Sequence, residues 1–61
     1  MNDGDTVVVI ADTEDNGAIG VIRGEATITI GRRAIVYKIV HFADGHEGAY
    51  EANELRAVPD T

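Results

Sequence analysis

Closely spaced turn signals constrain this chain more than any other feature of its sequence. The stretch AIVYKIVHFADGHEGAYEANELRAV, residues 34–58, has a long apolar run, an Asp44-Gly45 pair, a short run ending in Tyr50 and a last short run. Asp-Gly pairs favour tight turns, and short apolar runs between turns are typical of strands. This stretch therefore predicts a long strand, a turn and two short strands.

The N-terminal half predicts further strands. Residues 6–10 are all β-branched, which favours a strand. Gly20 lies inside an apolar run, where glycine indicates close backbone approach or a bend, and Arg23-Gly24 predicts a kink. Residues 25–30 alternate, which predicts threonines facing water and isoleucines facing the core.

The register of the next hairpin stays open at this stage. Gly31-Arg32 suits a two-residue type II′ turn, which needs glycine first. A three-residue loop that includes Arg33 is the alternative, and the two choices exchange the faces of the following strand, Ala34–Phe42. Near the C-terminus, Glu51–Leu55 favours helix but is too short for a stable α-helix, so it predicts a single 3-10 turn.

Five or six short strands with one terminal helical turn predict an all-β fold, and we expect a small five-stranded barrel. Residues 17–22, after an acidic loop, resemble the opening of SH3-like barrel domains of the KOW and Tudor type. Residues 37–45, followed by 54–58, are similar to the closing half of these domains. The resemblance covers residues 5–58 and implies one SH3-like barrel domain over residues 1–61.

Two departures from this family affect function. KOW domains that bind RNA are generally basic, whereas this chain has a net charge of −6. Tudor domains that read methylated residues bind them in a cage of three or four aromatic side chains. This chain has only Tyr37, Phe42 and Tyr50, and the first two lie five residues apart, on opposite faces of a regular strand. We therefore expect neither direct nucleic-acid binding nor an aromatic cage.

Composition narrows the expected location of the protein and the kind of partner it binds. A 61-residue chain is marginally stable alone, and without cysteine it has no disulfide to compensate. No apolar run is long enough to span a membrane, and the first residues are acidic, unlike a secretory signal. The expectation is a cytoplasmic domain whose partner is another protein, basic in character, or a second copy of itself.

Catalytic and metal sites are not expected. The segment Asp12–Gly17 resembles the start of a calcium loop, but Arg23 stands where the bidentate glutamate belongs. The cluster from His41 to Glu47 offers at most two metal ligands at useful spacing. The chain has neither cysteine nor serine as a nucleophile. The prediction is a non-enzyme with no cofactor, metal or catalytic residue.

Excess apolar surface is the better indication of function. The strand Ala34–Phe42 is apolar on both faces, whereas half-exposed antiparallel strands normally alternate. Either a bend directs both faces into one core, or one face is a contact surface. The second interpretation predicts a protein-interaction module, with a small acidic phage-type inhibitor and a structural accessory subunit as alternatives. Its predicted partner-binding residues are Ile35, Tyr37, Ile39, Asp12, Glu14 and Asp15.

Overall fold

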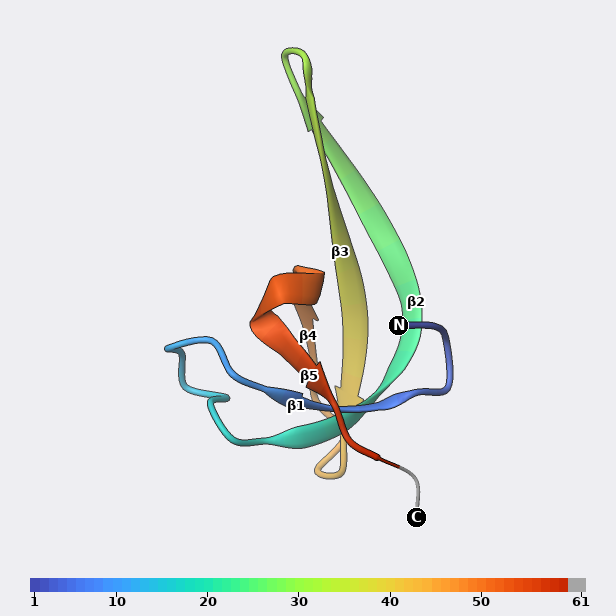
Figure 1. Ribbon diagram of the computed structural model, residues 1–61, viewed down its shortest axis with the longest axis vertical. Coiled ribbons are helices and arrows are strands. Elements are labelled where there is room, and N and C mark those ends of the chain that lie inside the picture. Colours follow the sequence, from blue (N-terminus) through green and yellow to red (C-terminus); the bar gives the residue numbers. More distant parts are fainter. Residues whose placement is uncertain (60–61) are drawn as a thin grey trace.

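The computed structural model describes residues 1–59 and contains one antiparallel sheet (Figure 1). Its elements are β1 (Thr6–Val9), β2 (Ile19–Ile30), β3 (Arg33–Phe42), β4 (Glu47–Tyr50), the 3-10 turn η1 (Ala52–Glu54) and β5 (Leu55–Ala57). The predictions of an all-β fold with five strands, and of a 3-10 turn directly before the last strand, are confirmed.

The strands lie in the order β4-β3-β2-β1-β5, and each neighbouring pair is antiparallel. Within residues 1–59 no ladder joins β4 to β5, so the sheet is open at both ends. The predicted closure into a barrel is therefore not confirmed. Backbone hydrogen bonds tie the C-terminal segment to β1: Ile10 N–H donates to the Glu54 carbonyl at 2.9 Å, and Val58 N–H donates to the Thr6 carbonyl at 2.9 Å.

One side of the sheet, the inner face, carries a single hydrophobic core. Every strand contributes to it, so short strands suffice to bury seven apolar side chains. No polar or charged residue is buried among residues 1–59. The core residues are Val7, Val9, Ile22, Val40, Phe42, Tyr50 and Leu55. We call this part of the molecule, residues 1–25 and 38–59, the body.

Gly20 shows why a strand in the body needs a glycine. A Cβ atom added there would lie 2.6 Å from Val40 Cγ1 and 2.7 Å from the His41 carbonyl oxygen. Real Cβ atoms do not approach other heavy atoms so closely, so β2 and β3 pack together only because residue 20 lacks a side chain. The prediction of close backbone approach at this position is confirmed.

A β-bulge lies where the sequence predicts a kink. Ile22 pairs with Val40 and Glu25 pairs with Lys38, so Arg23 and Gly24 together oppose one residue of β3. Gly24 has a φ of 120°, which side chains rarely tolerate. Bulges bend the strand that contains them, and β2 curves away from the body beyond this point (Figure 1).

The β2–β3 hairpin projects from the body, which makes the molecule 40 Å long but only 23 and 20 Å across (Figure 1). Ile30 pairs with Arg33, so the turn consists of two residues, Gly31 and Arg32. Gly31 has a φ of 61°, and no non-glycine residue among residues 1–59, Arg32 included, has a positive φ, as a type II′ turn requires. The two-residue alternative for the register is therefore the one the structure adopts.

Candidate interaction surface

The predicted residues Ile35, Tyr37 and Ile39 lie together on β3, on the side of the sheet opposite the core. Their neighbours Val40 and Phe42 belong to the core, whereas these three are half-buried outside it. The partly buried hydrophobic residues that pack against the core in the described chain are Ala11 and Ala18. Of the two interpretations left open by the sequence, the one in which a bend directs both faces of β3 into one core is therefore not the one the structure adopts.

Residues of β2 extend the same surface. Ala26 pairs with Tyr37 and Ile28 pairs with Ile35, and residues directly opposite in a ladder share a face. Ile28 is 49% exposed and Ile30 is 66% exposed. The prediction that the isoleucines of residues 25–30 face the core is therefore wrong.

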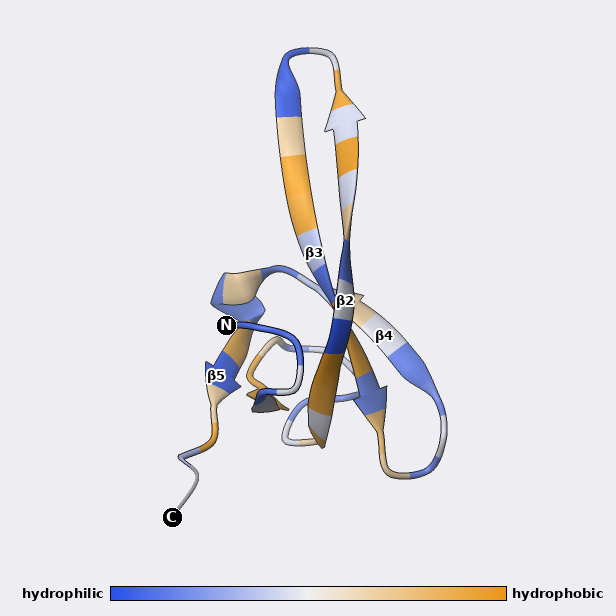
Figure 2. Ribbon diagram, turned by 90° about the vertical axis from the view of Figure 1, so that its right-hand side faces the viewer, coloured by the Kyte–Doolittle hydropathy of each residue, from blue (hydrophilic) through white to orange (hydrophobic). Residues whose placement is uncertain are grey.

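The bulge explains this error. Gly20 and Ile22, at even positions of β2, face the core, and regular alternation would put Ala26, Ile28 and Ile30 on the same side. Because the bulge inserts one extra residue, the even positions beyond it change sides. We call the resulting surface the outer apolar face; it consists of Ala26, Ile28, Ile30, Ile35, Tyr37 and Ile39. Figure 2 shows hydrophobic segments on both strands of the hairpin.

The two ends of this face differ in charge. At the tip, Ile30 pairs with Arg33 next to Arg32 of the turn. At the other end of β3, His41 pairs with Glu47 of β4, and their side chains lie 2.9 Å apart. Glu25 and Lys38, on the inner side between these ends, form an ion pair of 2.8 Å.

A shallow pocket of about 510 Å³ lies at the body end of the outer apolar face. Val21 and His41 are ladder partners in its wall, and Ile19, which also lines it, is 57% exposed. The pocket is wide enough to accept an apolar side chain. Its lining consists of Thr6, Ile19, Gly20, Val21, Arg23, His41, Phe42 and Ala43.

The three predicted acidic contacts separate into two groups. Asp12 and Glu14 are exposed, whereas Asp15 is half-buried. Tyr50 Oη donates a 2.6 Å hydrogen bond to one Asp15 oxygen, and His46 Nε2 lies 3.2 Å from the other. The Tyr50 hydrogen bond, helped by His46, lowers the pKa of Asp15 below its ordinary value. Asp15 therefore fastens the acidic loop, residues 12–17, to β4 and the turn before it, whereas Asp12 and Glu14 stay exposed for contacts with another molecule.

His46 is held between two carboxylates. Its Nδ1 is hydrogen-bonded to Asp44, which raises the pKa of His46, and Asp15 adds to this effect. The pKa of Asp44 is lowered by the backbone N–H of His46, which donates to it at 3.1 Å, and by the ring. The ring also stacks on Phe42, with centroids 4.5 Å apart. The contact with Asp15 raises the pKa of Tyr50, and burial adds to it.

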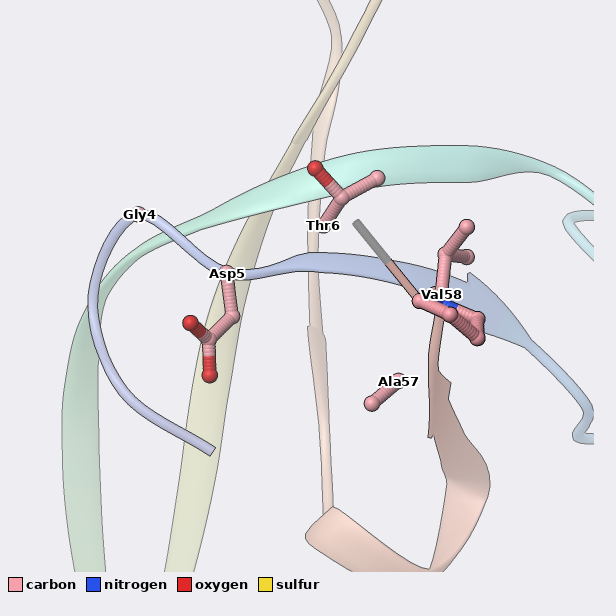
Figure 3. Close-up of a pocket in the computed structure, with 6 residues that line it drawn as sticks. Gly4, Asp5, Thr6, Ala57 and Val58 are labelled. Atoms are coloured by element: carbon pink, nitrogen blue, oxygen red, sulfur yellow. The ribbon is translucent and has the colours of Figure 1, made fainter. Parts of the chain in front are cut away.

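A second pocket, of about 420 Å³, lies between the start of β1 and the end of β5 (Figure 3). Asp5 carries the single titratable side chain in its described lining, and its carboxylate already accepts the Asn2 backbone N–H at 2.8 Å. Acid–base catalysis needs a second positioned group, which this lining does not provide. Among residues 1–59, no three His, Asp or Glu side chains are arranged to hold a metal ion.

Sequence reasoning missed Ile28 and Ile30 as part of the exposed surface. Arg23-Gly24 was the available signal, because a bulge there reverses the alternation that follows. It also missed the link from Asp15 to His46 and Tyr50, which are 31 and 35 residues away in the chain and carry no local signal for this contact.

Comparison of the chain with protein-family models, with curated proteins and with solved structures gives no match. In the described part of the chain, no helix is long and apolar enough to cross a membrane.

Proposed function

We propose that this chain is a non-catalytic protein-interaction module that binds its partner through the outer apolar face. The observation that carries the proposal is the position of that face: all of its residues except Ile39, which pairs with Ala49 of β4, lie on a two-stranded hairpin beyond the ladders with β1 and β4. A two-stranded hairpin is at best marginally stable in water, and a second layer that covers its apolar side stabilises it.

The energetic scale supports a contact role. Fully burying a large aliphatic side chain is worth about 1.5–3 kcal/mol, so covering several of them is a substantial gain for so small a domain. Two of the six exposed large hydrophobic residues of the described chain, Ile28 and Ile30, belong to the outer apolar face. As finer parts of the same proposal, we assign the fold to an open relative of the SH3-like barrels and the protein to the cytoplasm.

A photo-crosslinking amino acid at position 28 tests this function. Ile28 is half-exposed on the outer apolar face, and Arg56 is exposed on β5, outside that face, so position 56 is the matched control. In a lysate of the source organism we expect a crosslinked protein from position 28 and none from position 56. Absence of crosslinks from position 28, or equal crosslinking from both positions, would contradict the proposal.

A second candidate function is the acidic inhibitor of a basic nucleic-acid-binding protein. It is favoured by Asp12 and Glu14, which are exposed and form no ion pair within the described chain. Crosslinks from position 14 that disappear at high salt would support the inhibitor, since exposed charge pairs are screened. Salt-resistant crosslinks from position 28 would instead support the apolar contact, whether the partner is transient or a permanent structural subunit.

A further inference from the structure

We infer that the outer apolar face binds a second copy of this chain, in an antiparallel, face-to-face dimer with its two-fold axis near Tyr37. This inference rests on the proposed function, because it names the partner of the same surface. It is carried by two features that are complementary between the two ends of the face, charge and shape.

Charge is distributed so that the hairpin of one copy suits the body of another. Residues 26–37 contain two arginines and no acidic residue, whereas all eleven Asp and Glu residues lie elsewhere. Within one copy, Arg33 and Phe42 stand at opposite ends of the ten-residue strand β3. The two ends are therefore about 30 Å apart, which is several times the Debye length. The two ends therefore do not neutralise each other within a copy, but an antiparallel second copy brings them together.

The shapes of the two ends are also complementary between copies. Ile30, at the tip, is 66% exposed and protrudes with nothing beyond it but the turn. At the other end of the face lies the pocket of about 510 Å³ whose wall includes Val21 and His41. A protruding apolar side chain and an apolar pocket on one surface complement each other only between copies.

Tyr37 lies midway between the two ends of the face, so a two-fold axis there superposes each end on the opposite end of a second copy. On β3, Arg33 at the tip and His41 at the pocket are each four residues from Tyr37. Rotation about an axis at Tyr37 therefore places Arg33 of each copy over the His41–Glu47 end of the other, and Ile30 over the pocket. A two-fold interface forms each such contact twice, so the charge pair and the side chain in the pocket both occur at each end.

The available area indicates a dimer of modest affinity. Strand dimensions give the face about 30 Å by 15 Å, on the order of 1,000 Å² for two copies, which is the lower end of specific interfaces. Repulsion between two chains of net charge −6 also acts against association. We therefore expect a dissociation constant in the micromolar range.

Sedimentation equilibrium of the full chain tests the inference. Ile28→Asp places a charge on the outer apolar face and should weaken dimerisation at least about tenfold. Val36→Asp is the matched control, because Val36 pairs with Thr27 on the other side of the same hairpin and is 45% exposed. It should change the constant less than about threefold. Circular dichroism should show both variants folded, since neither residue belongs to the core.

Charge exchange tests the antiparallel arrangement. Arg33→Glu and Glu47→Arg should each weaken the homodimer about three- to tenfold, because each leaves like charges at both ends. An equimolar mixture of the two variants should form a heterodimer with the affinity of the original chain. Glu14→Arg, the same change on the acidic loop, should not restore binding when mixed with Arg33→Glu.

The outcomes separate this inference from the proposed function. A chain that stays monomeric to millimolar concentration, equal effects of Ile28→Asp and Val36→Asp, or a mixture that fails to recover affinity would each overturn the dimer. If the chain is monomeric but position 28 still crosslinks to a different protein, the dimer is wrong and the interaction module stands. If it is monomeric and position 28 gives no crosslink, both are wrong.

Discussion

The body and the projecting hairpin contain the same kinds of apolar residue in very different surroundings. In the body, Ile22 and Val40 are ladder partners with no exposed surface, covered by residues from all five strands. In the hairpin, Ile28 and Val36, two residues of the same types on the same two strands, are 49% and 45% exposed. The difference shows that strand pairing alone does not bury a side chain; a second layer must lie over it.

The largest expected effect comes from truncating matched isoleucines of β2. Ile22→Ala should cost about 2–5 kcal/mol, which approaches the whole stability of so small a domain and should leave much of the protein unfolded. Ile28→Ala should stay within about 0.5 kcal/mol in the monomer. Urea denaturation at low protein concentration measures both, and similar losses at the two positions would contradict the distinction between body and hairpin.

Enlarging a side chain in the body should lower the free energy of unfolding by a smaller amount. Gly20→Ala pushes a methyl group against Val40 and the backbone of β3, and overpacking of this kind costs about 1–3 kcal/mol. Ala34→Val adds two methyl groups at an exposed hairpin position and should change the free energy of unfolding by less than about 0.5 kcal/mol. Thermal melting compares the pair; an unchanged melting temperature for Gly20→Ala would show that the two strands can move apart without cost.

The His46 cluster should give the body a pH dependence that the hairpin lacks. The raised pKa of His46 stabilises the fold below its ordinary value of 6.5, and this contribution is lost as the pH rises through the raised value. The lowered pKa values of Asp15 and Asp44 stabilise the fold above their ordinary 3.8, and this is lost as the pH falls through the lowered values. The cluster therefore contributes most between these two ordinary values.

Urea unfolding at a series of pH values measures this contribution to the free energy of unfolding. The series runs from about pH 3 to about pH 9, roughly three units on either side of the ordinary histidine pKa. In His46→Gln the free energy of unfolding should decline less as the pH rises through the raised pKa of His46. Adding Asp15→Asn to this variant should change its stability at basic pH little further. An identical basic-side slope in the original chain and His46→Gln would show that the contacts of His46 do not stabilise the fold.

Shortening the hairpin should change the stability of the body only slightly. Removing residues 27–30 and 33–36 joins Ala26 and Tyr37, already ladder partners, through the same Gly31-Arg32 turn. The body should keep its free energy of unfolding within about 1 kcal/mol, because an uncovered two-stranded hairpin adds little. Dimerisation should be lost. Sedimentation and urea denaturation measure the two effects, and a shortened chain that does not fold would mean that the hairpin supports the body.

Much of the fold could be predicted because its signals are local. Gly31-Arg32 and Asp44-Gly45 mark turns through backbone conformation, and the run from Glu51 to Leu55 contains the 3-10 turn at Ala52–Glu54. The candidate surface was only partly predictable. Ile35, Tyr37 and Ile39 were grouped correctly on one face, because a regular strand alternates with a period of two.

By itself the sequence determined where the strands and turns lie, since glycine conformation and β-branched runs act over a few residues. Tertiary structure alone decided which side of the sheet each residue faces. A single bulge at Arg23-Gly24 sets whether Ile28 and Ile30 join the core or the outer apolar face, and its register depends on pairing with β3. The link from Asp15 to His46 and Tyr50 likewise exists only once the folded sheet brings distant segments together.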